Sequence, residues 1–411
     1  MKKKLLIAGL ALAFSLSIAA CSLNTVTTAE SSAEAQTSQT VSEESTVVNQ
    51  SYNTGSSFTD RDLEQTVDTT DATTIQVKDN EDISITGEGT YVLTGTASEV
   101  TVRIDADDDA KVQLVLDRVS ITNTDSPCIY VVSADKVLVT TVSGSENTLK
   151  VTGEFQPDGD TNTDAVIFSK DDLVLNGEGT LNINSTKNAV SCKDDLKITG
   201  GTYVIDCVKS GFEANDSILM SDGNITIKNC NDGLHAENED DDTLGYITIS
   251  GGTVEINAAD DGIHATSYLT IEDGSIKITA AEGMEATVIT INEGTLDISA
   301  SDDGINAAKK SSSYTPSCTI NGGEVTISMG SGDTDAIDSN GNLYINGGTL
   351  NITAQSPFDY DGDCEYTGGT LIVNGEETDT ITNQFMGGGG FGGNGGPDGM
   401  GNPDGRGGFG H

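Results

Sequence analysis

Short runs in which apolar and polar residues alternate recur through the middle of the chain. In each run two β-branched or leucine residues stand two positions apart, which is the period of a β-strand with one face in a core. The clearest runs are at 225–227, 254–256, 276–278, 296–298 and 350–352, with looser ones at 83–85, 91–93, 112–116 and 137–139. The pattern therefore predicts an all-β body.

A glycine marks each of these units. The marker glycines are Gly179, Gly201, Gly223, Gly252, Gly274, Gly294, Gly323, Gly348 and Gly369, and their spacings are 22, 22, 29, 22, 20, 29, 25 and 21 residues. A unit this short cannot bury its apolar side alone, so stacking into a solenoid is expected. Leucine-rich repeats would show a Leu-x-x-Leu-x-Leu pattern, which is missing. We predict a single-stranded parallel β-helix of about 22-residue coils, with a β-sandwich or a propeller as the alternatives.

The two ends of the chain differ from this body. Residues 1–20 read as a signal peptide, with three lysines before an apolar stretch. The run Ile18-Ala19-Ala20-Cys21 fits a bacterial lipobox, so Cys21 is expected to be lipidated and to hold an extracellular protein on the cell membrane. Residues 21–60 are predicted to be a disordered Ser/Thr-rich tether, residues 61–386 the β-helix, and residues 387–411 a Gly-rich disordered tail.

The net charge of the chain limits the kinds of ligand that it can bind. The chain has 65 acidic and 20 basic residues and a formal net charge of −45. This charge disfavours binding to nucleic acid through the body, and cations are the natural partners. Calcium, which prefers oxygen ligands, is the expected ion outside the cell.

Six cysteines remain after Cys21, and an even number in an exported chain suggests disulfides. Their spacing is not that of a small stapled scaffold, so we predict buried free thiols. A bond between Cys207 and Cys230 is disfavoured because their offsets from the marker glycines, six and seven residues, should place them on opposite faces of adjacent strands.

Acidic residues recur at a fixed distance after the marker glycines. An offset of nine residues leads to Asp232, Asp261 and Asp303, and the shorter coil that begins at Gly274 leads to Glu282. Stacked carboxylates repel one another unless a cation lies between them. The predicted calcium ligands are Asp232, Asp260, Asp261, Glu282, Asp302, Asp303, Asp335 and Asp338. The alternative is that these side chains only accept hydrogen bonds from turn amides.

The glycine after each of these acids is expected to allow a left-handed bend. One residue before the column, Lys209 is expected to be a counter-charge to nearby acids such as Glu213. The alternative is that Lys209 is a catalytic base, and it is the one candidate catalytic residue of the sequence.

The Gly-Gly-Thr coil starts and the Asp-Asp-Gly-Ile-x-Ala turns over residues 75–380 resemble a family of extracellular carbohydrate-binding β-helix proteins from clostridia and related bacteria. Their relatives by fold are calcium-dependent pectate lyases. The resemblance implies a right-handed helix, several calcium ions, and binding of cellulose and acidic polysaccharides without cleavage. The chain departs from the lyase turn Asp-Asp-Gly-x-Asp at His264 and Asn306, and no lysine matches the lyase base.

We therefore expect a monomeric, calcium-binding surface lipoprotein that binds polysaccharide without cleaving it. A calcium-dependent lyase and a structural spacer or adhesin are the alternatives. The chain has no tryptophan, which favours acidic glycans over a flat cellulose-stacking platform. Any such platform would rely on tyrosines, namely Tyr246, Tyr268, Tyr344 and Tyr360.

Overall fold

The computed structural model describes residues 58–331 and 334–383. The regular elements of these residues are all β-strands, β1 to β36, and none of their segments forms a helix. A helix long and apolar enough to cross a membrane is accordingly not found in this part of the chain. The predicted signal peptide, Cys21, most of the tether and the Gly-rich tail lie outside the described residues, so these assignments stay predictions.

The strands form two sheets. The smaller has 12 strands, which are β2 (Ile83–Ile85), β4 (Val102–Asp105), β6 (Ile129–Ser133), β9 (Ala165–Ser169), β12 (Asn188–Cys192), β15 (Phe212–Ala214), β18 (Leu234–Ala236), β21 (Asp261–Ala265), β24 (Glu282–Ala286), β27 (Ile305–Ala307), β30 (Asp335–Ser339) and β33 (Ser356–Tyr360).

The larger sheet has 24 strands and contains two rows. One row is β7 (Lys136–Thr141), β10 (Asp172–Gly177), β13 (Asp195–Ile198), β16 (Ser217–Met220), β19 (Tyr246–Ile249), β22 (Tyr268–Ile271), β25 (Val288–Ile291), β28 (Ser317–Ile320), β31 (Asn342–Ile345) and β34 (Cys364–Tyr366). The other is β8 (Glu146–Val151), β11 (Thr180–Asn184), β14 (Thr202–Asp206), β17 (Asn224–Cys230), β20 (Thr253–Ala258), β23 (Ser275–Ala280), β26 (Thr295–Ala300), β29 (Glu324–Met329), β32 (Thr349–Thr353) and β35 (Thr370–Val373).

The two rows are joined at the first repeats. There β1 (Thr73–Gln76), β3 (Gly89–Ser98) and β5 (Lys111–Asn123) pair in series, and β5 pairs with both β7 and β8. At the other end β36 (Glu376–Thr378) makes an antiparallel pair with β35.

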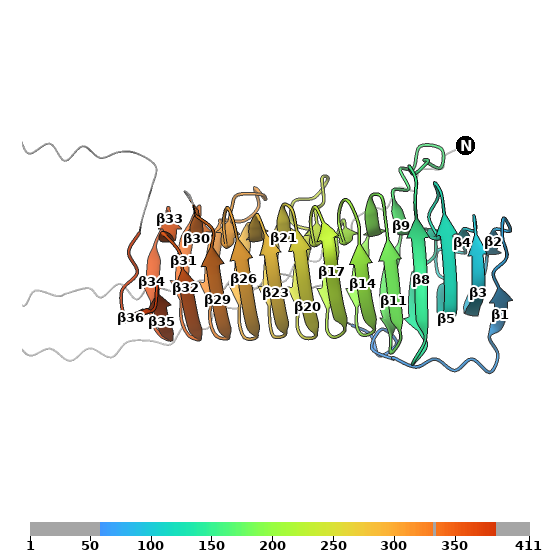
Figure 1. Ribbon diagram of the computed structural model, residues 1–411, viewed down its shortest axis with the longest axis horizontal. Coiled ribbons are helices and arrows are strands. Elements are labelled where there is room, and N and C mark those ends of the chain that lie inside the picture. Colours follow the sequence, from blue (N-terminus) through green and yellow to red (C-terminus); the bar gives the residue numbers. More distant parts are fainter. Residues whose placement is uncertain (1–57, 332–333, 384–411) are drawn as a thin grey trace, which may run out of the picture. The chain divides into compact units, whose positions relative to one another are not determined.

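From β7 to β32 each strand pairs in parallel with the strand three positions later, so one strand of each row makes up a repeat and the repeats lie side by side (Figure 1). The pairing keeps register. Ile256 lies opposite Ile278, and Ile278 lies opposite Ile298, and all three are at most 2% exposed. The all-β class and the parallel pairing predicted from the 22-residue period are confirmed, and the predicted strands at 225–227, 254–256 and 276–278 lie in β17, β20 and β23.

The glycines serve two different purposes. The marker glycines other than Gly179 have a positive φ, for example +87° at Gly252 and +124° at Gly274, where a side chain would be strained. The turn glycines after the acids, Gly262 and Gly283, are not left-handed, so the predicted bend is wrong there. A Cβ on Gly283 would lie 2.3 Å from the carbonyl oxygen of Gly304 in the next repeat. Close approach between repeats is therefore the reason for glycine at these turns.

The six cysteines are free, and all except Cys364 are buried, as predicted. Burial raises the pKa of the Cys128 and Cys318 thiols to about 12. The placement of Cys207 and Cys230 on opposite faces is wrong, because both are buried, at 5% and 6% exposure. A β-bulge between Ile227 and Cys230 shifts the register of β17 and returns Cys230 to the core.

A segment before β1 crosses the 24-stranded sheet. Asp62 is fully buried there and accepts hydrogen bonds of 2.9 and 3.2 Å from the Lys136 ammonium group. Lys197 lies 3.8 Å from the same carboxylate, and the Gln65 amide donates to the carbonyl oxygen of Thr199 at 2.8 Å. These contacts join residues more than 70 positions apart, so this segment is part of the folded body.

Candidate functional site

The predicted acidic column exists, and it lies where the chain enters the 12-stranded sheet. Asp261 pairs directly with Glu282, the first residues of β21 and β24. The repeats on either side continue the column, because the amide of Gly233 donates to the carbonyl oxygen of Asp261, and that of Gly283 to the carbonyl oxygen of Asp303. Constant spacing from the marker glycines thus placed these side chains at one edge.

Some of the column's carboxylates also accept hydrogen bonds from turn amides. Asp232 accepts from the amide of Asp261 at 3.4 Å, and Asp303 from the amide of Asp335 at 3.3 Å. This is the alternative role anticipated for these residues. Asp260 and Asp302 are exposed, each one residue outside the column. They do not join the partly buried carboxylates, although Asp260 lines the cavity described below.

A second row of side chains runs beside the column, three residues further along each turn. It consists of the outward-facing positions of the 12-stranded sheet, between core residues such as Ile263 and Ala265. In register the row reads Arg103, Tyr130, Phe168, Ser191, Glu213, His235, His264, Glu285, Asn306, Asp338 and Asp359. We call it the outer row. Of the predicted metal ligands, Asp338 belongs to this row and not to the column.

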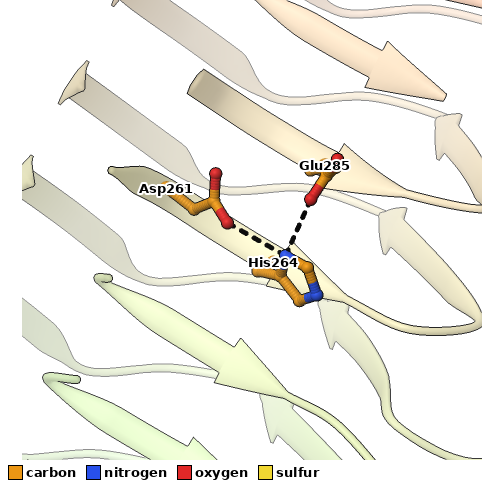
Figure 2. Close-up of side chains that lie close together, drawn as sticks. All are labelled: Asp261, His264 and Glu285. Carbon is orange, nitrogen blue, oxygen red and sulfur yellow. Dashed lines mark hydrogen bonds and ion pairs between the residues drawn. The ribbon is translucent and has the colours of Figure 1, made fainter. Parts of the chain in front are cut away.

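The centre of the outer row is a contact between three side chains from two adjacent strands (Figure 2). The Nδ1 atom of His264 lies 2.9 Å from Oδ2 of Asp261 and 2.9 Å from Oε2 of Glu285. Their side chains are only 11%, 13% and 6% exposed. Burial by itself lowers the pKa of His264, but the two carboxylates outweigh it and raise that pKa to about 9.

Lys310 completes this group. Its ammonium nitrogen lies 2.7 Å from Oε2 of Glu285. Although burial acts in the opposite direction, His264 and Lys310 together lower the pKa of Glu285. The second histidine of the row, His235, stacks on His264 with ring centroids 4.6 Å apart and an interplanar angle of 11°. In this group two carboxylates, Asp261 and Glu285, are therefore neutralised by two positive charges, on His264 and Lys310.

Two long turns shape the surroundings, and both come from the 29-residue units. The turn at 308–316 supplies Lys310, and the turn at 237–245 supplies Asp242. They meet across the intervening repeats, where Asp242 accepts hydrogen bonds from the hydroxyls of Ser312 and Ser313, both at 2.6 Å. A cavity of about 340 Å³ is lined by the column's Asp232, Asp261 and Glu282, by His235 and His264, and by Lys310.

In the described repeats that follow His264, neighbouring carboxylates lie close together and are not paired with a histidine or lysine as Glu285 is. Burial and the charge of Glu285 raise the pKa of Glu282 to about 7. Burial and the charges of Asp338 and Glu282 raise the pKa of Asp303 to about 7, and burial with Asp359 and Asp335 raises that of Asp338 to about 6. A bound cation would relieve this repulsion.

The other candidates lie elsewhere. Lys209 is 56% exposed and its ammonium lies 3.9 Å from Asp164, so it forms a weak ion pair outside the central group. Glu213, its predicted partner, is paired with Lys193 at 2.8 Å instead. Tyr246 and Tyr268 are 6% and 2% exposed and stack on each other at 4.7 Å. A tyrosine platform that includes these two residues is therefore wrong.

A second cavity lies on the first repeats, at the other end of the outer row. It measures about 370 Å³, and its lining includes Arg103, Tyr130 and Asp158. Arg103 lies over the Tyr130 ring at 5.1 Å and pairs with Asp158 at 3.2 Å. One face of one sheet therefore carries these two cavities, and Phe168, Ser191 and Glu213 of the outer row lie between them.

The fold and this face define a class: an all-β protein of parallel three-strand repeats with a polar face along one sheet. The sequence model of the carbohydrate-binding domain-containing proteins matches residues 79–356 and again residues 287–385, more than half of the chain. The chain belongs to this family. The carbohydrate-binding family predicted from the coil motifs is thus confirmed, while the lipid anchor and the clostridial affiliation stay predictions.

Two individual proteins are similar. A carbohydrate-binding domain-containing protein of Acetivibrio thermocellus is 37% identical over 123 residues, which are 29% of this chain and 43% of that protein. The similarity thus spans less than half of that relative. A gadolinium derivative of the polysaccharide lyase-like protein from C. thermocellum has 31% sequence identity and a TM-score of 0.49, over 55% of this chain and 96% of that chain.

Proposed function

We propose that the protein binds polysaccharide along the face of the 12-stranded sheet, at the cell surface and as a monomer. The observation that carries the proposal is the outer row, which runs in register from Arg103 to Asp359. One cavity lies at its first residues, Arg103 and Tyr130, and the other lies at His235, His264 and Glu285. A long polar face suits a polymer better than a single sugar. Membership of the carbohydrate-binding family supports the same class of ligand.

The ligand we propose is an acidic, pectin-like glycan held in the presence of Ca²⁺, with cellulose as the other candidate. Glu282, Asp303, Asp335 and Asp338, which lie along three successive repeats, are the carboxylates to which we assign calcium binding, since their donor atoms are all oxygens and three of the four carboxyls have raised pKa values. When bound, calcium would neutralise this cluster and offer coordination positions to uronate carboxylates. The chain's own residues would supply the hydroxyl contacts, through side chains such as Asn306 and His235.

We further propose that the repeats wind as one right-handed parallel β-helix and that Cys21 anchors it to the membrane. The strand pairing at a constant interval of three supports continuous winding.

A lyase remains the second candidate. Neither Lys209, the predicted candidate base, nor Lys310 favours it: Lys209 is largely exposed, and Glu285, against the effect of burial, raises the pKa of Lys310, so its ammonium group is a poor base.

Affinity measurements on polygalacturonate, cellulose and a neutral soluble glucan test the proposal, each with calcium and with EGTA. Retention on polygalacturonate that EGTA abolishes is the expected result. Retention on none of the three would leave a structural spacer or adhesin as the function. The appearance of ultraviolet absorbance from unsaturated uronides in the same mixtures would establish a lyase.

A further inference from the structure

The central group differs from the rest of the acidic column in its donor atoms. Asp261, His264 and Glu285 offer two carboxylate oxygens and one imidazole nitrogen, all within 4.8 Å of one another. Calcium takes oxygen ligands, whereas imidazole together with carboxylate suits zinc and the neighbouring divalent transition metals. The residues that fit calcium and the residues of this group are therefore chemically distinct.

The distances fit shared ligation. Bonds from zinc to nitrogen or carboxylate oxygen are about 2.0–2.2 Å, so two ligands at the tetrahedral angle lie about 3.4 Å apart, and the carboxylates need to move outward by only about 0.5 Å to bind it. The Nδ1 atom of His264 lies 2.9 Å from each carboxylate oxygen. A single proton on Nδ1 points along one direction in the ring plane and cannot satisfy both oxygens fully. Figure 2 shows both carboxylates directed at this one nitrogen, and an ion bound by all three ligand atoms, which lie within 4.8 Å of one another, would satisfy both oxygens.

The surroundings also fit a metal centre. Asn306 donates to Oε1 of Glu285 at 3.3 Å, the kind of hydrogen bond that orients a ligating carboxylate. The Oδ1 atom of Asn306, a residue only 8% exposed, has no hydrogen-bond partner, so an acceptor is available to a water on the ion. The adjoining cavity of about 340 Å³ has room for the remaining ligands.

We propose that Asp261, His264 and Glu285 bind a divalent transition metal ion of the zinc type, at a site separate from the proposed calcium ligands. Binding displaces the proton on Nδ1 of His264 and moves the Lys310 ammonium away from Glu285. Lys310 is 38% exposed, so its side chain can turn to solvent. In the absence of the metal, these two positive charges balance the two carboxylates.

Calorimetric titration of the purified protein with Zn²⁺ alone, without glycan, tests the proposal. We expect one tight site, with affinity at least about tenfold weaker in His264→Ala. His411→Ala is the control, because His411 is outside the described residues and is the remaining histidine apart from His235 and His264. Its affinity should equal that of the parent. Lys310→Met should bind more tightly, since a competing cation is removed.

A second readout covers the case in which His264→Ala does not fold. The isosteric Glu285→Gln should also weaken zinc at least about tenfold, and a Cu²⁺-loaded parent should show imidazole nitrogen coupling by electron paramagnetic resonance. Equal zinc affinity in the parent, His264→Ala and Glu285→Gln would overturn the proposal. So would displacement of zinc by excess calcium, because the site would then be an ordinary oxygen-ligand cation site. Neither result depends on whether the protein binds polysaccharide.

Discussion

Gly283→Ala should destabilise the protein strongly, although it adds only one methyl group. The new Cβ would lie 2.3 Å from the carbonyl oxygen of Gly304 and 2.5 Å from Cγ2 of Ile298. To bring the first contact to 3.0 Å, adjacent repeats must separate by about 0.7 Å. The hydrogen bonds from the amides of Gly283 and Met284 into the next repeat, 2.8 and 3.1 Å long, would then stretch to their limit or break.

The expected loss can be worked from these contacts. Overpacking a well-packed site costs about 1–3 kcal/mol, and each weakened hydrogen bond adds up to about 1 kcal/mol. The free energy of unfolding should therefore fall by roughly 2–4 kcal/mol. Urea denaturation followed by far-ultraviolet circular dichroism measures it as a lower midpoint with an unchanged slope.

Gly87→Ala is the matched control, since Gly87 has no left-handed φ and nothing within 4 Å of an added Cβ. It should be neutral or slightly stabilising. The reasoning about close approach is refuted if Gly283→Ala stays within about 0.5 kcal/mol of the parent protein.

Three further outcomes are expected. Lys136→Met should lower the free energy of unfolding by roughly 3 kcal/mol in urea denaturation, because it leaves the buried Asp62 carboxylate with the more distant Lys197 as its only cationic partner, besides the hydrogen bond from the Thr59 amide. Asp194→Asn should raise the melting temperature at pH 8 and leave it nearly unchanged at about pH 4, because burial and neighbouring carboxylates raise the pKa of Asp194 to about 7. The folded state binds that proton more tightly than the unfolded chain, so the carboxylate costs stability as pH rises from about 4 to about 7. In alkylation by iodoacetamide, Cys364 should react before Cys318, which is fully buried.

Each of these has a result that would contradict it. For the buried ion pair, Lys111→Met is the control, because Lys111 is 48% exposed and makes only a 3.6 Å surface pair; equal effects of the two substitutions would contradict the role of burial. A stabilisation by Asp194→Asn that is the same at both pH values would point away from ionisation. Simultaneous labelling of all six thiols in native buffer would show that the core opens readily.

The strand pattern and the acidic column could be predicted because both depend on local spacing. A period of two residues and a constant offset from the marker glycines follow from the geometry of stacked strands, and they located Asp261 and Glu282 correctly. The same geometry could have located His264 and Glu285. They stand three residues beyond the column in the same turns, with an apolar residue between, so the same offset from the marker glycines fixes their place.

Lys310 and Asp62 could not be predicted in this way. Lys310 reaches the site because its turn is held by Asp242, about 70 residues earlier in the chain. Asp62 is buried by Lys136, 74 positions away. Contacts over such distances depend on the final packing and leave no periodic trace in the sequence. The sequence does indicate where the long turns lie, because they fall in the two units of 29 residues.

Retention of the protein on immobilised polygalacturonate in calcium buffer tests the central claim most directly. Asp303→Asn combined with Asp338→Asn removes two charges from the binding face, and asparagine at 303 preserves the acceptor for the Asp335 amide. Glu255→Gln combined with Asp297→Asn removes two charges from exposed positions of the other sheet. We predict at least about tenfold weaker binding for the first pair and parent-like binding for the second. Equal retention of both double variants would contradict the account.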